Sequence, residues 1–286
     1  MFSRLSLLLL LLAVGVTDSL LADDLEVFPT DVALRYSTDL QRIVAVLHTE
    51  KGSREVTADV TYSIANSDIV EVGSVGVLQP KGNGDTTITV QIGKSQKQIR
   101  VGVTDFELDG PVSFELHIQP ILAARGCSTG PCHGKARGQN GFQLSLLGFD
   151  SDFDFNALTR EARGRRIFPA SPKESLLLKK GAGHVPHGGG IRLPDDSHDY
   201  QTIKRWIETG APRSIEQEPV LESVEIFPTD RVMIPSETQQ LVVIATYSDG
   251  TQRDVTGQSA FQSNESVVVG VTDEGVIKSG PIPGEA

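Results

Sequence analysis

Near both ends of the chain, short runs of apolar and polar residues alternate and are separated by turn-forming residues. RIVAVL at 42–47 and QLVVIA at 240–245 are two such runs. Turn-rich segments interrupt the pattern, for example KGNGD at 81–85 and SDGT at 248–251. Short apolar-rich runs bounded by Gly, Asn, Asp and Ser are typical of antiparallel strands joined by tight turns. The pattern therefore predicts all-β sandwiches at both ends.

The two β-rich segments are copies of one another. LEVFPTD at 25–31 recurs as VEIFPTD at 224–230, and REVT at 54–57 recurs as RDVT at 253–256, both at an offset of 199 residues. A register that is kept over several blocks indicates an internal repeat. The second copy stops before a counterpart of the TTITV run at 86–90. A sandwich without its last strands has an open edge, so we expect a larger polypeptide that continues past residue 286.

Between the copies, apolar residues follow a helical spacing instead. The positions that carry it are Phe114, Ile118, Ile121 and Leu122 early in the segment, and Ile203, Trp206 and Ile207 near its end. This spacing predicts amphipathic helices and a small, mainly α module. The expected organisation is a signal peptide (1–22), a first β-module (23–105), a mainly α module (111–213) and a C-terminally truncated second β-module (220–286).

The first residues have the layout of a secretory signal peptide. Arg4 precedes an apolar run from Leu5 to Val16, and Ala22 is the expected last residue removed. That run is short for a bilayer span. We therefore expect an exported protein, in the periplasm or at the cell surface, with no transmembrane span after signal removal.

Charge separates the middle of the chain from its flanks. The 286 residues carry a formal net charge of −11, yet residues 111–215 hold 14 Lys and Arg against 10 Asp and Glu. The acidic balance argues against non-specific binding to nucleic acid or to anionic membranes. The two cysteines are too few for a disulfide-rich scaffold, and neither β-module carries an arrangement of catalytic residues.

The middle segment contains the run Cys127-Ser-Thr-Gly-Pro-Cys132-His133. Two cysteines closed by Cys-His are typical of c-type haem attachment, in which the thiols bond the porphyrin and the adjacent histidine binds the iron. Four residues separate these cysteines where two are usual, and Gly130-Pro131 can form a turn that absorbs the difference. A plain disulfide, a zinc site and a redox-active dithiol remain open alternatives.

The run ILAARGCSTGPCHGK, followed further on by YQTIKRWIETGAP, resembles the cytochrome c-like module of large exported planctomycete proteins. In that family the module lies among bacterial immunoglobulin-like domains of group 2 (BIG2), which the flanking repeats resemble. The resemblance implies a multidomain fold in which all-β immunoglobulin-like sandwiches flank a small, mainly α cytochrome c-like domain. It also implies one covalent haem c at Cys127 and Cys132, with His133 as the proximal iron ligand.

The distal iron ligand is expected to be a histidine. Residues 111–215 contain no methionine, which is the common distal ligand in small cytochromes c. His117 and His198 lie in helical or polar surroundings, which leaves His184 and His187 in the loop before the last helix. We favour His187, which belongs to a PHGGG run that matches the family, with His184 as the alternative.

Two functions follow from these patterns. The first is an exported c-type cytochrome module that passes single electrons to an unknown redox partner protein and is not an enzyme. The alternative is a cell-surface adhesion or structural protein whose central module is closed by a disulfide and holds no haem.

Overall fold

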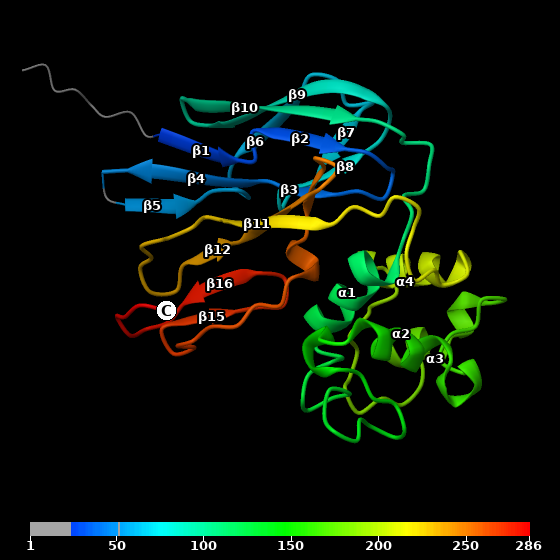
Figure 1. Cartoon of the computed structure of the whole chain (residues 1–286). Helices are drawn as coiled ribbons and strands as arrows, with labels where there is room; N and C mark the ends of the chain where they lie inside the picture. The colour runs from blue at the N-terminus through cyan, green and yellow to red at the C-terminus, as the bar shows by residue number, and fades with distance from the viewer. Residues whose placement is uncertain (1–23, 51) are drawn as a thin grey trace, which may run out of the picture.

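The computed structural model describes residues 24–50 and 52–286, and the predicted signal peptide lies outside these residues. In the described part, sixteen β-strands account for most of the regular structure, together with four short α-helices. Figure 1 shows two β regions stacked on one another, with the helices gathered beside them. One β region comes from each copy of the repeat, and the helical region comes from the segment between them.

The first β region contains ten strands that cover a common core. They are β1 (Asp24–Phe28), β2 (Asp31–Leu34), β3 (Gln41–Arg42), β4 (Val44–Thr49), β5 (Gly52–Glu55), β6 (Thr61–Ile64), β7 (Val70–Val72), β8 (Val77–Pro80), β9 (Gly84–Ile92) and β10 (Ser95–Val103). The sheet orders are β1-β4-β5, β2-β10-β9-β6 and β3-β8-β7. Alternate residues of β1, such as Leu25 and Val27, pack with Ile88 and Ile99 in the core between the layers.

The second β region repeats part of this arrangement. Its strands are β11 (Leu221–Phe227), β12 (Thr238–Gln240), β13 (Val242–Tyr247), β14 (Gln252–Asp254), β15 (Val269–Val271) and β16 (Val276–Ser279). The sheets β11-β13-β14 and β12-β16-β15 correspond to β1-β4-β5 and β3-β8-β7. Both copies also contain a cis peptide bond at the same motif position, Phe28-Pro29 and Phe227-Pro228.

The second copy differs in having no counterpart of the four-stranded sheet among its described residues. The consequence is visible on the strand that opens each copy. Leu25 and Val27 are 1% and 5% exposed, whereas the matching Val224 and Ile226 are 53% and 43% exposed. Side chains whose counterparts are core in the first copy therefore lie at the surface in the second.

The helical region contains α1 (Gln119–Ala124), α2 (Ser151–Thr159), α3 (Leu176–Gly181) and α4 (His198–Glu208), together with a π-helical turn (Phe114–Ile118). Short 3₁₀ turns lie at Leu146–Gly148, Glu161–Gly164, Pro172–Glu174 and, in the second β region, Thr256–Gln258. Side chains cap two of the helices, because Asp150 accepts from the amide of Phe153 and Ser197 from that of Tyr200. These caps fix where α2 and α4 begin.

The predicted fold class, immunoglobulin-like sandwiches around a cytochrome c-like domain, is wrong. The molecule is mostly β-sheet, and its helices are 6, 9, 6 and 11 residues long. Aromatic side chains fill the space between them: the ring of Phe114 lies 5.4 Å from that of Phe155 and 5.8 Å from that of Trp206. The helical spacing in the sequence does produce helices, but they are short and pack directly on one another.

Candidate functional site

The two cysteines lie in a tight loop that follows α1. The amide of His133 donates to the carbonyl of Cys127 at 3.0 Å, and the amide of Gly134 donates to that of Thr129 at 2.9 Å. A Cβ atom at Gly134 would lie 2.0 Å from the carbonyl oxygen of Ser128, so only glycine fits this turn. Both thiols are free, and burial, followed by the neighbouring Cys132, raises the pKa of Cys127 to about 11.

The structure brings together two of the three predicted histidines. The rings of His133 and His187 are stacked, with centroids 6.3 Å apart and planes inclined by 9°. Each ring donates from Nδ1 to a backbone carbonyl, that of Phe142 for His133 and that of Gly190 for His187. Burial lowers the pKa of His133. His184 is turned elsewhere, since its Nε2 lies 2.8 Å from Asp195.

These residues do not fit a covalent haem. The rings of His133 and His187 lie parallel with their centroids 6.3 Å apart, and the ring of Phe142 packs 4.4 Å from that of His133. The Arg166 guanidinium lies 4.5 Å from the centroid of the Phe142 ring. No group of three or more His, Cys, Asp or Glu side chains that could hold a metal ion occurs in the described part of the chain. The predicted haem c, and with it iron binding, is wrong. A role for Cys127, Cys132, His133 and His187 as site residues stays a prediction.

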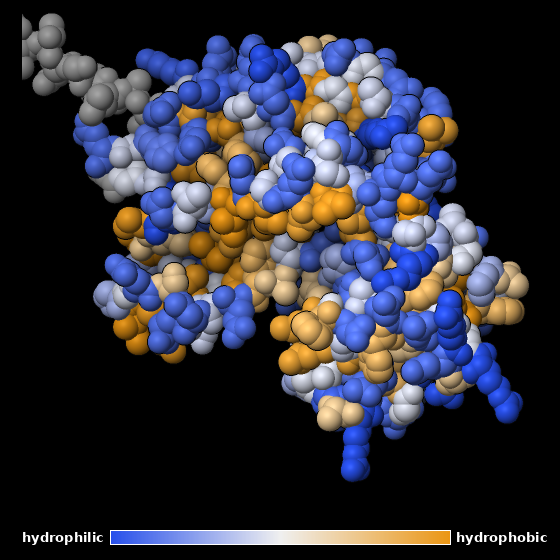
Figure 2. Space-filling view, viewed as in Figure 1, coloured by the Kyte–Doolittle hydropathy of each residue, from blue (hydrophilic) through white to orange (hydrophobic). Residues whose placement is uncertain are grey.

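A second site, which the sequence analysis missed, is the contact between the two repeats. Phe28 and Phe227 stack with ring centroids 4.5 Å apart and planes inclined by 13°. Beside them, valine and isoleucine side chains from β4 and β13 form one buried cluster: Val44, Val46, Val242 and Ile244. In the space-filling view, apolar side chains gather where the two β regions meet (Figure 2).

Polar contacts at this interface are reciprocal. The amide of Arg42 donates to Asp254 at 2.6 Å, and the amide of Gln240 donates to Glu55 at 2.6 Å. Glu55 and Asp254 are equivalent by the 199-residue offset. Arg42 and Gln240 are equivalent by register, because they pair with Val77 and Val276. Matching surfaces of the two copies therefore meet about an approximate two-fold axis, as in an isologous dimer.

The sequence contains a signal for this interface. Residues 44–47 and 242–245 are each four consecutive apolar residues that are all buried. An alternating strand buries one face, whereas a continuous apolar run indicates that both faces are covered. In β4, Ala45 and Leu47 point into the module's own core, while Val44 and Val46 point to the other copy.

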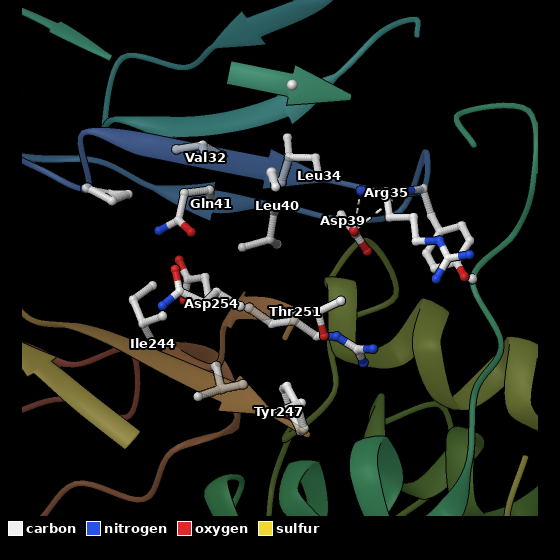
Figure 3. Close-up of a pocket in the computed structure, with 18 of the residues that line it drawn as sticks. Val32, Leu34, Arg35, Asp39, Leu40, Gln41, Ile244, Tyr247, Thr251 and Asp254 are labelled. Atoms are coloured by element: carbon white, nitrogen blue, oxygen red, sulfur yellow. Dashed lines mark hydrogen bonds between the residues drawn. The ribbon is translucent and has the colours of Figure 1, made fainter. Parts of the chain in front are cut away.

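A cavity of about 1160 Å³ lies where the two β regions and the helical region converge. Figure 3 shows residues of the first β region, such as Leu40 and Gln41, facing Ile244 and Tyr247 of the second across this space. The helical region adds four polar or basic side chains to the wall, namely His117, His198, Thr202 and Arg205. Clefts at domain junctions are common places for ligands.

Comparison with known proteins gives one relative over nearly the whole chain. No family model matches. Ice-binding protein 1 of Shewanella frigidimarina is 22% identical over 271 residues, which are 95% of this chain and 27% of that protein. The chain thus spans about a quarter of the length of this relative. No helix in the described residues combines the length and the apolar character that a bilayer crossing requires.

Solved structures of the S-layer protein SbsC are similar to parts of the chain. Its domains 4 and 5 are 20% identical, with a TM-score of 0.25 and coverage of 28% of this chain and 50% of that one. The longer fragment rSbsC(31–844) is 21% identical, with a TM-score of 0.26 and coverage of 31% and 13%. Similarity at this level carries no argument about fold or function.

These comparisons overturn the family resemblance. With no matching family model, and with an ice-binding protein as the relative that covers 95% of the chain, the assignment to planctomycete proteins with a cytochrome c-like module among BIG2 domains is wrong. Cytochrome c, haem binding and electron transfer do not describe this chain.

Proposed function

We propose that the chain is an exported, surface-associated protein with a structural or adhesive role and no enzymatic activity. The observation that carries the proposal is the reciprocal contact between the two repeats. Phe28 stacks on Phe227, and two carboxylates accept hydrogen bonds from backbone amides of the other copy. A two-fold contact with an apolar centre holds neighbouring modules in one orientation, which suits a rigid spacer better than a flexible tether. The ice-binding name of the relative supports a non-enzymatic role.

The proposal includes a central module that is closed by a disulfide between Cys127 and Cys132. The hydrogen bond from His133 to Cys127 already draws the two ends of the loop together, as a short disulfide requires. Closure removes two protons and two electrons from the thiols, which a disulfide oxidant of an exported compartment accepts by thiol–disulfide exchange. A redox partner for electron transfer has no place in this proposal, because the haem prediction is wrong.

The proposal also places this chain in a larger polypeptide that continues past residue 286. Its support is the exposure of Val224 and Ile226, whose counterparts Leu25 and Val27 are covered by the sheet that contains β9 and β10. Exposed apolar side chains on a strand are typical of a surface that another segment covers.

Surface location can be tested on intact cells of the native host with a membrane-impermeant biotin reagent. We expect the protein to be labelled before lysis as fully as after it. Labelling that occurs only after lysis would contradict the surface location.

The structural role can be tested in a deletion strain that is complemented with variants at equal protein level. We expect the deletion to weaken surface attachment or detergent resistance, and the wild-type chain to restore it. Val44→Asp buries a charge in the interface and should fail to restore it. Val75→Asp is the matched control, because Val75 is 69% exposed. A deletion strain that attaches and resists detergent like its parent would overturn the proposed role.

A further inference from the structure

Two arginines in the cavity between the three regions form no ion pair within 4 Å among the described residues. These are Arg205 of α4 and Arg253 of β14. Six carboxylates line the cavity, and none of them lies within ion-pair distance of either arginine. Asp254 pairs with Arg42, Asp39 accepts from the amide of Arg35, and Asp249 accepts from Thr251. Cationic groups that remain unpaired in a partly desolvated cleft favour binding of an anion.

One donor group of Arg205 is also unsatisfied, and one of Arg253 faces a histidine nitrogen. Nε of Arg205 is buried and has no hydrogen-bond partner within the part of the chain that the structure describes. Nη1 of Arg253 lies 3.4 Å from Nε2 of His117, and its guanidinium packs over the ring of Tyr247. Buried N–H groups without an acceptor are uncommon in folded proteins, because each one has lost its hydrogen bonds to water.

His117 cannot serve as the acceptor for Arg253. Its Nδ1 already accepts from the amide of Ser113 at 3.1 Å. A neutral imidazole has one acceptor nitrogen and one donor nitrogen, so this bond places the remaining proton on Nε2. Burial, together with Arg253 and Arg205, lowers the pKa of His117 to about 4, so the ring is neutral at neutral pH. Nε2–H of His117 and Nη1–H of Arg253 are then two donors that face each other.

We propose that the cavity binds an oxyanion group, which accepts hydrogen bonds from Arg205, Arg253 and Nε2–H of His117. Carboxylate, sulfate and phosphate share this chemistry, since each offers negatively charged oxygens to several donors at once. Such a group resolves the contact between the two facing donors and supplies the acceptor that Nε of Arg205 lacks. The cavity volume of about 1160 Å³ leaves room for the rest of a small ligand. The inference is independent of the proposed structural role.

Binding can be measured by isothermal titration calorimetry on the whole chain, with acetate, sulfate and inorganic phosphate at constant ionic strength. We expect saturable binding of at least one of these probes, and their order distinguishes a planar carboxylate from a tetrahedral anion. R253Q and R205Q should each raise the Kd at least tenfold. H117F, which removes the Nε2–H donor and keeps a ring, should raise it as well.

R35Q is the matched control, because Arg35 lines the same cavity but already pairs with Asp105 at 2.9 Å. Its Kd should stay within twofold of the wild-type value. Circular dichroism shows whether each variant is folded, and R253Q alone decides the outcome if R205Q is not. The absence of saturable binding for all three probes would overturn the proposal, and so would an unchanged Kd in folded R253Q.

Discussion

Phe28 and Phe227 lie 199 residues apart in the chain and stack face to face, with ring centroids 4.5 Å apart. Each is the last residue of the opening strand of its copy, β1 or β11, and precedes a proline. The stacking makes the copies contact through equivalent residues, so a substitution on one side has a natural counterpart on the other. The interface can therefore be tested with pairs of matched variants.

Breaking the ion pair between the repeats should cost about 3 kcal/mol of unfolding free energy. The Asp254 carboxylate is fully buried and accepts from both the amide and the guanidinium of Arg42. Removing one partner of a buried pair leaves the other charge uncompensated. We expect this loss for D254N in urea denaturation. The control D59N breaks an exposed pair with Arg54 and should change stability by less than about 1 kcal/mol. Equal effects of the two variants would contradict a buried interface.

The opening strands of the two copies should respond differently to the same substitution. Val27 is 5% exposed and Val224 is 53% exposed, although both are valines of the opening strand of their copy, two positions apart in the repeat. V27A should destabilise the chain by about 2 kcal/mol, since it removes buried methyl groups. V224A should stay within about 0.5 kcal/mol, as is usual for surface positions. Denaturant titration measures both, and a large loss for V224A would show that this strand is covered in solution.

The repeat and the helices could be predicted from the sequence, whereas the interface between the repeats and the cavity depend on contacts between distant segments. The shared FPTD motif and the REVT/RDVT pair indicated two related β-modules, and the spacing around Phe114 and Trp206 indicated helices. The Cys127–His133 motif led to a haem prediction because a motif fixes residue types and spacing, but not what fills the space around them. Here Phe142 and the stacked His187 fill it.

The cavity lay beyond sequence reasoning for a different reason. Its facing donors come from three elements in two regions: His117 from the π-helical turn and Arg205 from α4 in the helical region, and Arg253 from β14 in the second β region. Their convergence depends on how the modules dock. The contact between the two β regions depends in turn on residues such as Val44 and Val242. In the sequence, only the unbroken apolar run around each of these residues indicates that both faces of its strand are buried.

Oxidation of the cysteine loop should stabilise the helical region. A disulfide between Cys127 and Cys132 closes a small loop, for which the loss of unfolded-state entropy corresponds to about 2 kcal/mol. We expect the oxidised protein to be more stable than the reduced protein by this amount in denaturant titration. Mass spectrometry of alkylated peptides reports the bond itself. The C127S/C132S double variant provides the control, since its stability should not change with reductant.

A stability difference between oxidised and reduced wild-type protein that is also present in the double variant would show that the effect arises elsewhere. If peptide mapping finds both thiols fully alkylated after treatment with a disulfide oxidant, the closed loop is ruled out. The high pKa of Cys127, about 11, makes the attack by its thiolate slow at neutral pH. We therefore expect faster closure as the pH of the oxidation is raised from 7 to 9.

Stability should fall as the pH is lowered from about 6.5 to about 4, because His117 is held neutral in the folded chain. Its pKa is lowered from 6.5 to about 4, first by burial and then by electrostatic interaction with Arg253, Arg205 and His198. Between these two pH values the unfolded chain binds a proton that the folded chain does not, so protonation favours unfolding. The contribution is complete above pH 6.5 and reaches up to about 3 kcal/mol. Urea denaturation at pH 7.5, 6.0 and 4.5 measures it. H117Q should flatten this dependence. An unchanged slope in H117Q would place the pH dependence on another group and would remove the evidence that the ring is neutral beside the two arginines.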